Sequence, residues 1–540
     1  MSLTFRRHYR VVLLLALVLA VLVAGLGKQR IIAYNLISDS GDAGSSRSNA
    51  AAGALFDDSA VHTVQILIKP ADYEQMISTY RQTGEKDWFH ADVVIDGTRV
   101  NDVGIRLKGN ASLRTALGGG GRGGMPGGAQ GGQPGDRQRF QAPADGEMPE
   151  GWQNMQPPAD GQMPQRPDGW QGMAPPADGE MPEGWQGFRP PADGALAPFP
   201  QAGADLTATV SSEVKLPFLI RFDKFVKGQT YQGLQRLCIR NYGISSDAAM
   251  LHEPVTNAMG RLAGLPTTRA AFAGVALNGE PERLYVICEA IDETYLDSTF
   301  DYGRGVMYKA EVNSSLNYKG DDPSAYASSF SQETRENDAD MGPLIALARF
   351  LTESDEATFE AELPQRLDVE AFATYLALNA LLVNTDSMVG MSNNYYLYYD
   401  DQAGFFTLLM WDANESLGKL SMGGGAQGAQ FDLYLSSTSM RMPGGGSKNI
   451  LLQRFMANAT FQALYEAKLQ EVYQKVFLSG ALAEKVEEYA ALIREVNPDR
   501  NLVDLPSYDQ AVAQVQSFVA QRYAYLSTTP LLARLATDAP

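Results

Sequence analysis

The stretch NTDSMVGMSNNYYLYYDDQAGFFTLLMWDANESLG, residues 384–418, decides how the rest of this chain is interpreted. Its centre predicts a β-hairpin, because two runs rich in β-forming residues, 395–399 and 405–411, flank the turn residues 400–404. A hairpin brings its two outer ends together. We therefore expect the polar residues that precede the first strand to meet those that follow the second.

Oxygen-bearing side chains stand at both ends of this predicted hairpin. Asp386, Asn393 and Asn394 precede it, and Asp412 and Asn414 follow it. Asp386 and Asp412 are 26 residues apart in the sequence, yet the hairpin should bring them to one place. Carboxylate and amide oxygens that converge in this way suit Mg²⁺ or Ca²⁺. The sequence therefore predicts a site for a hard divalent cation.

Length and composition limit the classes of protein. A chain of 540 residues has room for two or three compact domains. Its formal net charge of −19 argues against a nucleic-acid partner, since such proteins need a basic face. Only four histidines are present, which argues against a His-rich zinc site. Cys238 and Cys288 lie in apolar runs that resemble strands, which favours buried free thiols over a disulfide.

The N-terminal segment has the pattern of a membrane anchor. Basic residues precede the uncharged apolar run 11–27, and as a helix this run would span about 25 Å, within the range of a bilayer core. We interpret 1–30 as an uncleaved signal anchor, with a cleaved signal peptide as the alternative. The basic end would stay in the cytoplasm and the remainder would face outward, or be secreted after cleavage. Residues 31–61 would be a flexible spacer.

Residues 118–205 form a low-complexity block. They contain 21 Gly and 15 Pro in 88 residues, too many for regular elements. The unit PADGEMPEGWQ occurs at 143–153 and again at 176–186. We interpret the block as a disordered insertion. A surface that binds a partner through its tryptophans is the alternative.

The rest of the chain changes from strands to helices. Short strands are predicted through 62–117 and 215–310, with a hairpin turn at Asn278–Gly279. A helix is predicted over 247–263 with Asp247 as its N-cap; alternatively, this helix begins at Pro254. Helical periodicity then covers 343–352, 355–362, 368–383, 448–478, 481–496 and 507–526, with 419–448 as a mobile loop between them. This order predicts an α+β protein with two lobes, 62–292 and 293–530.

Several segments resemble the spore-coat protein H kinases, the CotH kinase family. The resemblance covers about residues 62–530, apart from 118–205, and is carried by VGIRLKGNAS (103–112), KLPFLIRFDKF (215–225), YVICEAID (285–292) and the stretch 384–418. It implies a protein-kinase-like fold with a β-rich N-lobe and a helical C-lobe. It also implies transfer of a phosphoryl group from ATP to a protein hydroxyl, with Mg²⁺ or Mn²⁺.

The resemblance assigns roles around the hairpin. Asp386 corresponds to the aspartate that receives or orients the acceptor hydroxyl. Asn394 and Asp412 correspond to metal ligands. Asn414 stands where the family has a second acid, and it offers an oxygen ligand without charge. No His-Arg-Asp sequence precedes Asp386, since Asn384 and Thr385 stand there.

The nucleotide side of the site is expected in the N-lobe. Glu253 is a candidate for the helix glutamate that pairs with a phosphate-binding base. We leave that base open among three residues: Lys108, Lys215 and Arg221. Glu289 falls where the hinge between the lobes would lie, and its semi-buried carboxylate needs a partner, which a ribose or an amine of the nucleotide would supply. No G-x-G-x-x-G loop is present near the first strands.

These patterns lead to two functional hypotheses. The first is an ATP-dependent kinase, anchored outside the cytoplasm, that phosphorylates Ser or Thr of a surface or secreted protein, or of itself. The second is a structural or assembly protein of the cell surface that uses the same fold as a binding platform without turnover.

Overall fold

The computed structural model describes residues 54–109, 113, 116–117, 215–241, 248–300, 305–335, 340–420, 425–435 and 449–537. The predicted anchor 1–30 and the predicted insertion 118–205 lie outside these ranges, as do Asp247 and most of the loop predicted over 419–448. No helix of the described residues is both long enough and apolar enough to cross a membrane.

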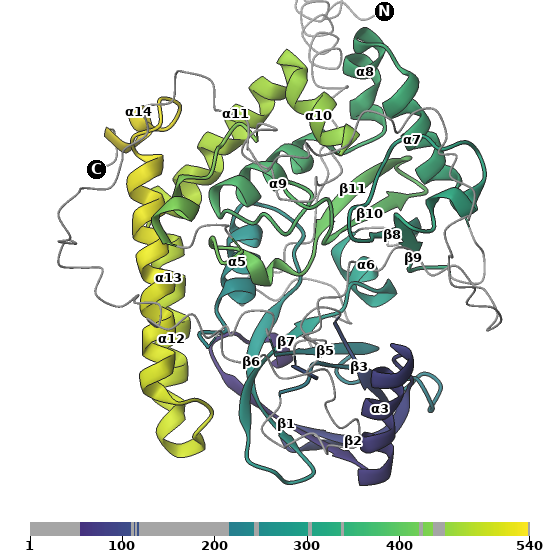
Figure 1. Ribbon diagram of the computed structural model, residues 1–540, viewed down its shortest axis with the longest axis vertical. Helices are drawn as coiled ribbons and strands as arrows, with labels where there is room; N and C mark the ends of the chain where they lie inside the picture. Colours follow the sequence, from purple (N-terminus) through teal and green to yellow (C-terminus); the bar gives the residue numbers. More distant parts are fainter. Residues whose placement is uncertain are drawn as a thin grey trace, which may run out of the picture. The chain divides into compact units, whose positions relative to one another are not determined.

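A closed barrel of seven strands forms the first half, in the order β1-β2-β3-β4-β5-β7-β6 (Figure 1). The strands are β1 Val61–Ile68, β2 Phe89–Ile95, β3 Thr98–Leu107, β4 Phe218–Arg221, β5 Arg236–Arg240, β6 Ala270–Leu277 and β7 Arg283–Glu289. Parallel pairing of β1 with β6 closes the barrel. Alternate residues of β1 are buried, because successive side chains of a strand point to opposite faces.

Two helices accompany the barrel, α3 Pro70–Thr83 and α5 His252–Leu262. Helix α5 starts later than the predicted 247–263. Pro254 therefore lies in its first turn, where a missing amide costs nothing. The predicted turn between β6 and β7 is confirmed, with φ of 50° at Asn278 and 82° at Gly279.

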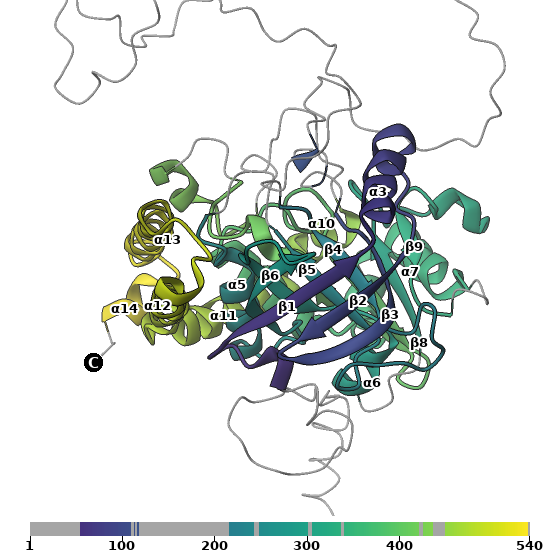
Figure 2. The ribbon, with the colours of Figure 1, turned by 90° about the horizontal axis from the view of Figure 1, so that it is seen from below.

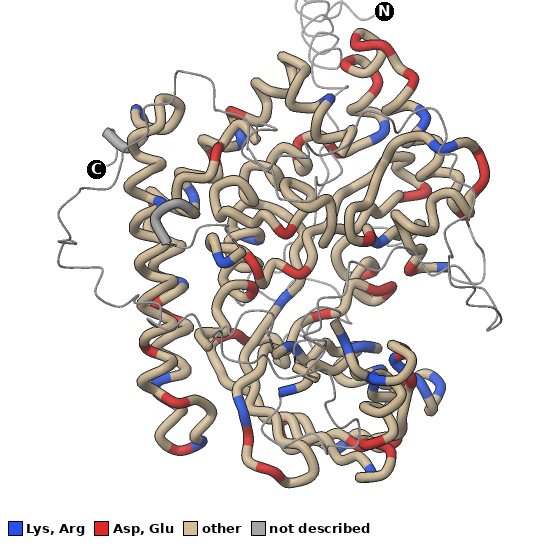
Figure 3. The backbone as a smooth tube through the Cα atoms, in the orientation of Figure 1, with Lys and Arg blue, Asp and Glu red and all other residues tan. Residues whose placement is uncertain are grey.

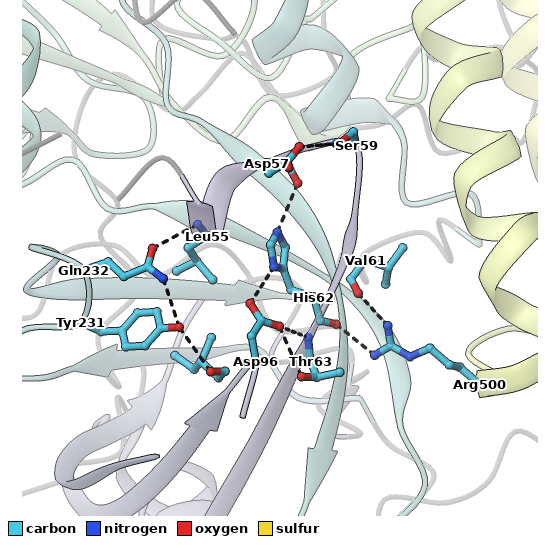
Figure 4. A network of polar contacts seen from close by, with 11 residues as sticks. Leu55, Asp57, Ser59, Val61, His62, Thr63, Asp96, Tyr231, Gln232 and Arg500 are labelled. Carbon is cyan, nitrogen blue, oxygen red and sulfur yellow. Dashed lines mark hydrogen bonds and ion pairs between the residues drawn. The ribbon is translucent and has the colours of Figure 1, made fainter. Parts of the chain in front are cut away.

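The folded region starts before the boundary predicted at residue 62. A short 3₁₀ helix, η1 Ala54–Phe56, buries Leu55 and Phe56 completely or almost completely. The Leu55 amide donates to Gln232 Oε1 at 3.2 Å, as Figure 4 shows. The end of the predicted spacer is thus part of the domain, because two apolar side chains in it find a place against the barrel.

The second half combines helices with a smaller sheet. Its helices are α6 Glu293–Thr299, α7 Gly342–Glu353, α8 Glu356–Glu362, α9 Val369–Leu381, α10 Ile450–Ala457, α11 Ala459–Tyr473, α12 Ala481–Arg500, α13 Leu505–Leu526 and α14 Ala533–Thr537. Shorter helical turns are η2 Pro323–Tyr326, η3 Leu363–Gln365, η4 Ala413–Glu415, η5 Gly425–Gln430 and the π-helical η6 Gln474–Leu478. The sheet has the order β11-β10-β8-β9. Its strands are β8 Gly305–Ala310, β9 Phe330–Gln332, β10 Tyr395–Asp400 and β11 Phe405–Met410.

The predicted hairpin is confirmed. Strands β10 and β11 pair antiparallel from Tyr395 opposite Met410 to Asp400 opposite Phe405. The helix predicted over 448–478 is divided instead, because Asn458 ends α10 and caps α11 by accepting the amides of Thr460 and Phe461.

Helices α12 and α13 lie side by side in two perpendicular views (Figures 1 and 2). The end of α12 binds the barrel through Arg500, whose guanidinium donates to the carbonyls of Val61 and His62 at 2.7 and 3.0 Å (Figure 4). It also donates to Glu282 at 2.8 Å. His62 is held in turn by Asp96 at 2.8 Å. The C-terminal helices therefore anchor the first strand of the barrel.

The predicted α+β class is confirmed, with a barrel in the first half and mainly helices in the second. Both cysteines are free and buried, as predicted, and Cys238 of β5 lies directly opposite Cys288 of β7. Asp and Glu are spread over both halves rather than gathered on one element (Figure 3).

Candidate active site

The two ends of the hairpin meet, as the sequence predicted. The Trp411 amide donates to the Asn394 carbonyl at 3.3 Å, just beyond the last paired residues of β10 and β11. Asn394 and Asp412 both adopt left-handed backbone conformations, with φ of 54° and 56°. Asn and Asp tolerate this region better than most residues do. These two residues therefore leave the strands at the same point.

Asp386 lies in the loop between α9 and β10 and is held by the two asparagines before the hairpin. Asn393 Nδ2 donates to Asp386 Oδ1 at 2.8 Å, and Asn394 Nδ2 donates to Oδ2 at 3.0 Å. Burial raises the pKa of Asp386, while the two amide donors and the positive charge of Lys419 act in the opposite direction. The carboxylate is thus fixed in place beside the start of β10.

A single arginine joins the barrel to the hairpin. Arg240, the last residue of β5, binds Glu253 of α5 through Nε at 2.8 Å and also forms an ion pair with Asp412. The side chains of Arg240 and Glu253 are 9% and 1% exposed, so this pair is shielded from water. A buried carboxylate needs such a partner.

Trp411 supports two cations at the same place. Lys108 Nζ lies 5.1 Å from the centre of a Trp411 ring, and Arg240 Cζ lies 5.2 Å from it. Tyr396 packs against the indole edge-on. Cation–π attraction of this kind fixes charged side chains without neutralising them. Lys108 and Arg240 are therefore positioned together next to Asp412.

Further arginines lie on strands β3, β4 and β5. Arg106 lies on β3 and Lys108 follows directly after this strand, two residues further on; Arg236 and Arg240, four residues apart on β5, share a face. Burial lowers the pKa of Arg106, and the positive charges of Arg236 and Arg221 lower it further. Like charges this close repel one another, which makes the region favourable for an anion.

The expected partner of Glu253 needs correction. Its salt bridge is made with Arg240, which was not among the three candidates. Lys215 Nζ donates to the Leu284 carbonyl at 3.2 Å, and Arg221 pairs with Asp223 at 2.8 Å. Lys108 is the one of the three that lies at Trp411.

Glu289 also differs from its expected role. It lies at the end of β7, and both of its oxygens bind Arg269: Oε2 accepts the backbone amide at 2.7 Å, and Oε1 accepts Nη2 at 2.6 Å. Its need for a partner is thus met within the protein rather than by a ribose or amine. Beside this pair is a pocket of about 150 Å³, lined in part by Arg236 and Asp292.

Three residues after β11 form a second polar group. Asn414 and Glu415 belong to η4, and both are buried. Lys419 Nζ lies 3.3 Å from the Asn414 carbonyl and 3.3 Å from Glu415 Oε1. Sequence reasoning named Asn414 as a ligand but missed Glu415 and Lys419, which the pattern of a strand and turn gave no reason to select.

The donor set suits a metal that is bound together with a nucleotide. No group of three or more His, Cys, Asp or Glu side chains is placed to hold an ion among the residues described. Asp412 and Asn394 offer one carboxylate and one amide oxygen at the point where the strands end. Mg²⁺ is commonly held by one or two carboxylates with phosphate oxygens and water completing its shell, so these residues fit it.

Arg240, Glu253 and Asp412 thus join the barrel to the helical part of the protein. The sequence identifies the family: the family model described as CotH kinase protein matches residues 208–526, more than half of the chain. The chain therefore belongs to the CotH kinase family, and the resemblance noted from its motifs is confirmed.

Two further proteins are similar to this chain. Inner spore coat protein H of Bacillus subtilis (strain 168) is 22% identical over 275 residues, which cover 49% of this chain and 70% of that protein. The solved structure of the Helicobacter pylori proinflammatory kinase CtkA matches over 55% of this chain and 89% of its own, at 10% identity and a TM-score of 0.28.

Proposed function

We propose that this protein is an ATP-dependent atypical protein kinase that phosphorylates Ser or Thr of another protein. The observation that carries the proposal is the position of Arg240, which contacts a buried helix glutamate and the aspartate after the hairpin. Protein kinases use a strand cation paired with a helix glutamate, together with a metal-binding aspartate, for the same reaction.

Each charged group then has a task. Arg240 and Lys108 bind phosphate oxygens of ATP, because both are fixed at Trp411, next to the aspartate assigned to the metal. Asp412 and Asn394 would hold Mg²⁺ or Mn²⁺, which neutralises charge on the β- and γ-phosphates when bound. Asn414 is the third candidate ligand, although the residue is only 8% exposed.

Asp386 acts on the acceptor. The acceptor hydroxyl oxygen forms a bond to the γ-phosphorus, the bond from that phosphorus to the bridging oxygen breaks, and ADP leaves. Asp386 accepts or orients the hydroxyl proton. Asn393 and Asn394 keep its carboxylate in place through the hydrogen bonds described above.

We further propose that the acceptor is a surface or secreted protein. The support is the predicted anchor 1–30, which would place the domain outside the cytoplasm or release it after cleavage. The two sources of acceptor, this chain itself and another protein, are distinguished by whether label from ATP appears on the purified chain alone or on an added protein.

A binding platform without turnover is the second candidate. It is favoured by Asn414, which lacks the charge of the acid found at this position in the family. In that case the protein would bind nucleotide and metal but would transfer no phosphate.

Incubation with labelled ATP and Mg²⁺ or Mn²⁺ tests the two candidates against each other. Asp386→Asn and Asp412→Asn should each abolish label transfer, whereas Asp401→Asn, a change of an exposed carboxylate in the hairpin turn, should not. Nucleotide binding without transfer by the unaltered protein would favour the platform. Transfer that persists in both site variants would show that the site is wrongly assigned.

A further inference from the structure

Lys419 and Glu415 form an ion pair, and neither residue has a role in the reaction proposed above. Their side chains are 9% and 1% exposed, and they follow β11 on the same segment as Asp412. A lysine that is this deeply buried loses most of its hydration, so its charge must be met by specific acceptors.

The acceptors around Lys419 do not use all the hydrogen-bond donors of its ammonium group. An ammonium group has three donors. Lys419 has two acceptors in the described structure, the Asn414 carbonyl and Glu415 Oε1, and both lie at 3.3 Å. Charge-assisted N–H···O⁻ bonds are usually about 2.7–2.9 Å long, so both contacts are long.

Glu415 is also incompletely satisfied. Its Oε2 is buried and has no hydrogen-bond partner among the residues that the structure describes. Burial raises the pKa of Glu415, and Lys419 opposes this rise while the charge of Asp386 adds to it. A purely structural ion pair would be expected to use both carboxylate oxygens and shorter contacts. This pair has room for a further group.

Lys419 also lies close to the position assigned to the acceptor. Its charge is felt at Asp386, where it opposes the effect of burial. Arg240 and Lys108 lie at Trp411 and are assigned to the phosphates, whereas the charge of Lys419 acts on Asp386, which is assigned to the acceptor. Negative charge on the transferring phosphoryl group spreads over three oxygens, and a fixed cation next to the acceptor aspartate would stabilise it.

We propose that the Lys419 ammonium binds the γ-phosphoryl group of ATP and that Glu415 is the residue that positions it. This inference rests on the proposed kinase function. It also gives a reason for Asn414: where an acid would recruit additional metal charge, this chain supplies a lysine four residues after Glu415 instead.

Nucleotide affinities separate this role from a structural one. The dissociation constants of a non-hydrolysable ATP analogue and of ADP should be measured with Mg²⁺ for the full chain and for Lys419→Met. We expect Lys419→Met to raise the dissociation constant of the analogue by about tenfold, the effect of losing a charged hydrogen bond. The dissociation constant of ADP should rise by less than about twofold. Lys419→Arg should retain most of the preference for the analogue, and Glu415→Gln should lose only part of it.

Two matched variants support the interpretation. Lys475→Met removes an exposed lysine that pairs with Glu471 on α11, and it should change neither affinity. Arg240→Met should weaken the binding of both nucleotides, because Arg240 is assigned to phosphates that ADP also carries. If Lys419→Met does not fold, the double variant Lys419→Met with Glu415→Gln is used instead, because it leaves no unpaired buried charge. The same two dissociation constants are measured for it.

The outcomes distinguish the two levels of the proposal. If the unaltered protein binds neither nucleotide, the kinase assignment fails, and this inference fails with it. If it binds both and Lys419→Met weakens them equally, or weakens neither, Lys419 does not contact the γ-phosphoryl group and only the further inference is overturned.

Discussion

Arg240 reaches Glu253 through Nε at 2.8 Å, and its Nη2 pairs with Asp412. One side chain therefore connects strand β5 of the barrel, helix α5 and the segment that follows β11. Arg240 and Glu253 are 13 residues apart along the chain, whereas Asp412 follows 159 residues after Glu253. The connection brings Arg240, proposed to bind phosphate, and Asp412, proposed to bind metal, within contact distance, so the geometry of the proposed site depends on it.

Replacing Arg240 by methionine should affect both stability and binding. Removal of one partner of a buried ion pair typically costs about 3–5 kcal/mol, because the other charge is left without its counterion. We expect a loss of this order in the free energy of unfolding, measured by urea denaturation. Affinity for ADP should fall at least about tenfold, the loss expected when a charged hydrogen bond is removed.

Arg335→Met is the control for this change. Arg335 pairs with Asp401 at a partly exposed site, and such pairs contribute about 0–1 kcal/mol. If Arg240→Met unfolds no more easily than Arg335→Met and binds ADP normally, then the Arg240 pair contributes neither to the fold nor to nucleotide binding.

The stability of the protein should depend on the ionisation of Asp292. This side chain caps helix α6 by accepting the Tyr295 amide, and burial raises its pKa to about 7. The folded state holds the proton more tightly than the unfolded chain, so this carboxyl contributes most at low pH, and its contribution falls as pH rises toward 7. Asp292→Asn keeps the cap and removes the titration. The stability of this variant relative to the unaltered protein should therefore increase between about pH 4 and pH 7, by on the order of 1 kcal/mol per pH unit.

Asp355→Asn should show the opposite sign. Asp355 caps α8 from an exposed position, and the amide it binds lowers its pKa. Its contribution is present at neutral pH and is lost as the solution becomes acidic. Melting temperatures of both variants, measured from about pH 2 to pH 8, provide the comparison, because the contribution of Asp355 is lost only below about pH 4. A difference between Asp292→Asn and the unaltered protein that does not change with pH would contradict the raised pKa.

Arg522 should be among the most sensitive residues of the helical half. It is fully buried on α13 and donates to the carbonyls of Ala380 and Leu381 at the end of α9, and to those of Ala429 and Phe431. A cation is favoured at a helix C-terminus, and the planar guanidinium reaches four acceptors that an ammonium cannot span. Arg522→Lys should cost about 3 kcal/mol of unfolding free energy, from two or three lost hydrogen bonds.

The same change should disturb the site, because α9 leads directly into the loop that carries Asp386. Arg494→Lys, at a partly exposed pair with Asp509, should cost less than about 1 kcal/mol. If the two variants melt at the same temperature, the four carbonyl contacts of Arg522 contribute little.

Deletion of 118–205 tests the interpretation of this block. Strands β3 and β4 pair up to Leu107 opposite Phe218, so the ends of the long connection lie next to each other. If the block makes no packing contacts, shortening this loop roughly fivefold should raise the free energy of unfolding by about 1 kcal/mol through reduced loop entropy. A fall of several kcal/mol in calorimetry or denaturation would show that the block packs against the domain.

The hairpin and its polar ends could be predicted from local sequence. Two continuous runs of β-forming residues, 395–399 and 405–411, flank the turn at 400–404 and determine two paired strands, and pairing alone requires Asn394 to meet Trp411. The α+β class followed from the change in periodicity along the chain. The cysteines were also predictable, since apolar neighbours indicate burial.

The partners of the charged residues were decided by tertiary structure. Arg240 is one of several basic residues on neighbouring strands, and nothing in its local sequence marks it as the partner of Glu253. The closed barrel places Arg240 where it contacts Glu253 of α5. The hairpin of β10 and β11 then brings Asp412 to the same guanidinium. The ion pairs of Glu289 with Arg269 and of Lys419 with Glu415 also depend on how the folded chain packs. Periodicity records which face of an element is buried, whereas the pairing of buried charges depends on which elements meet.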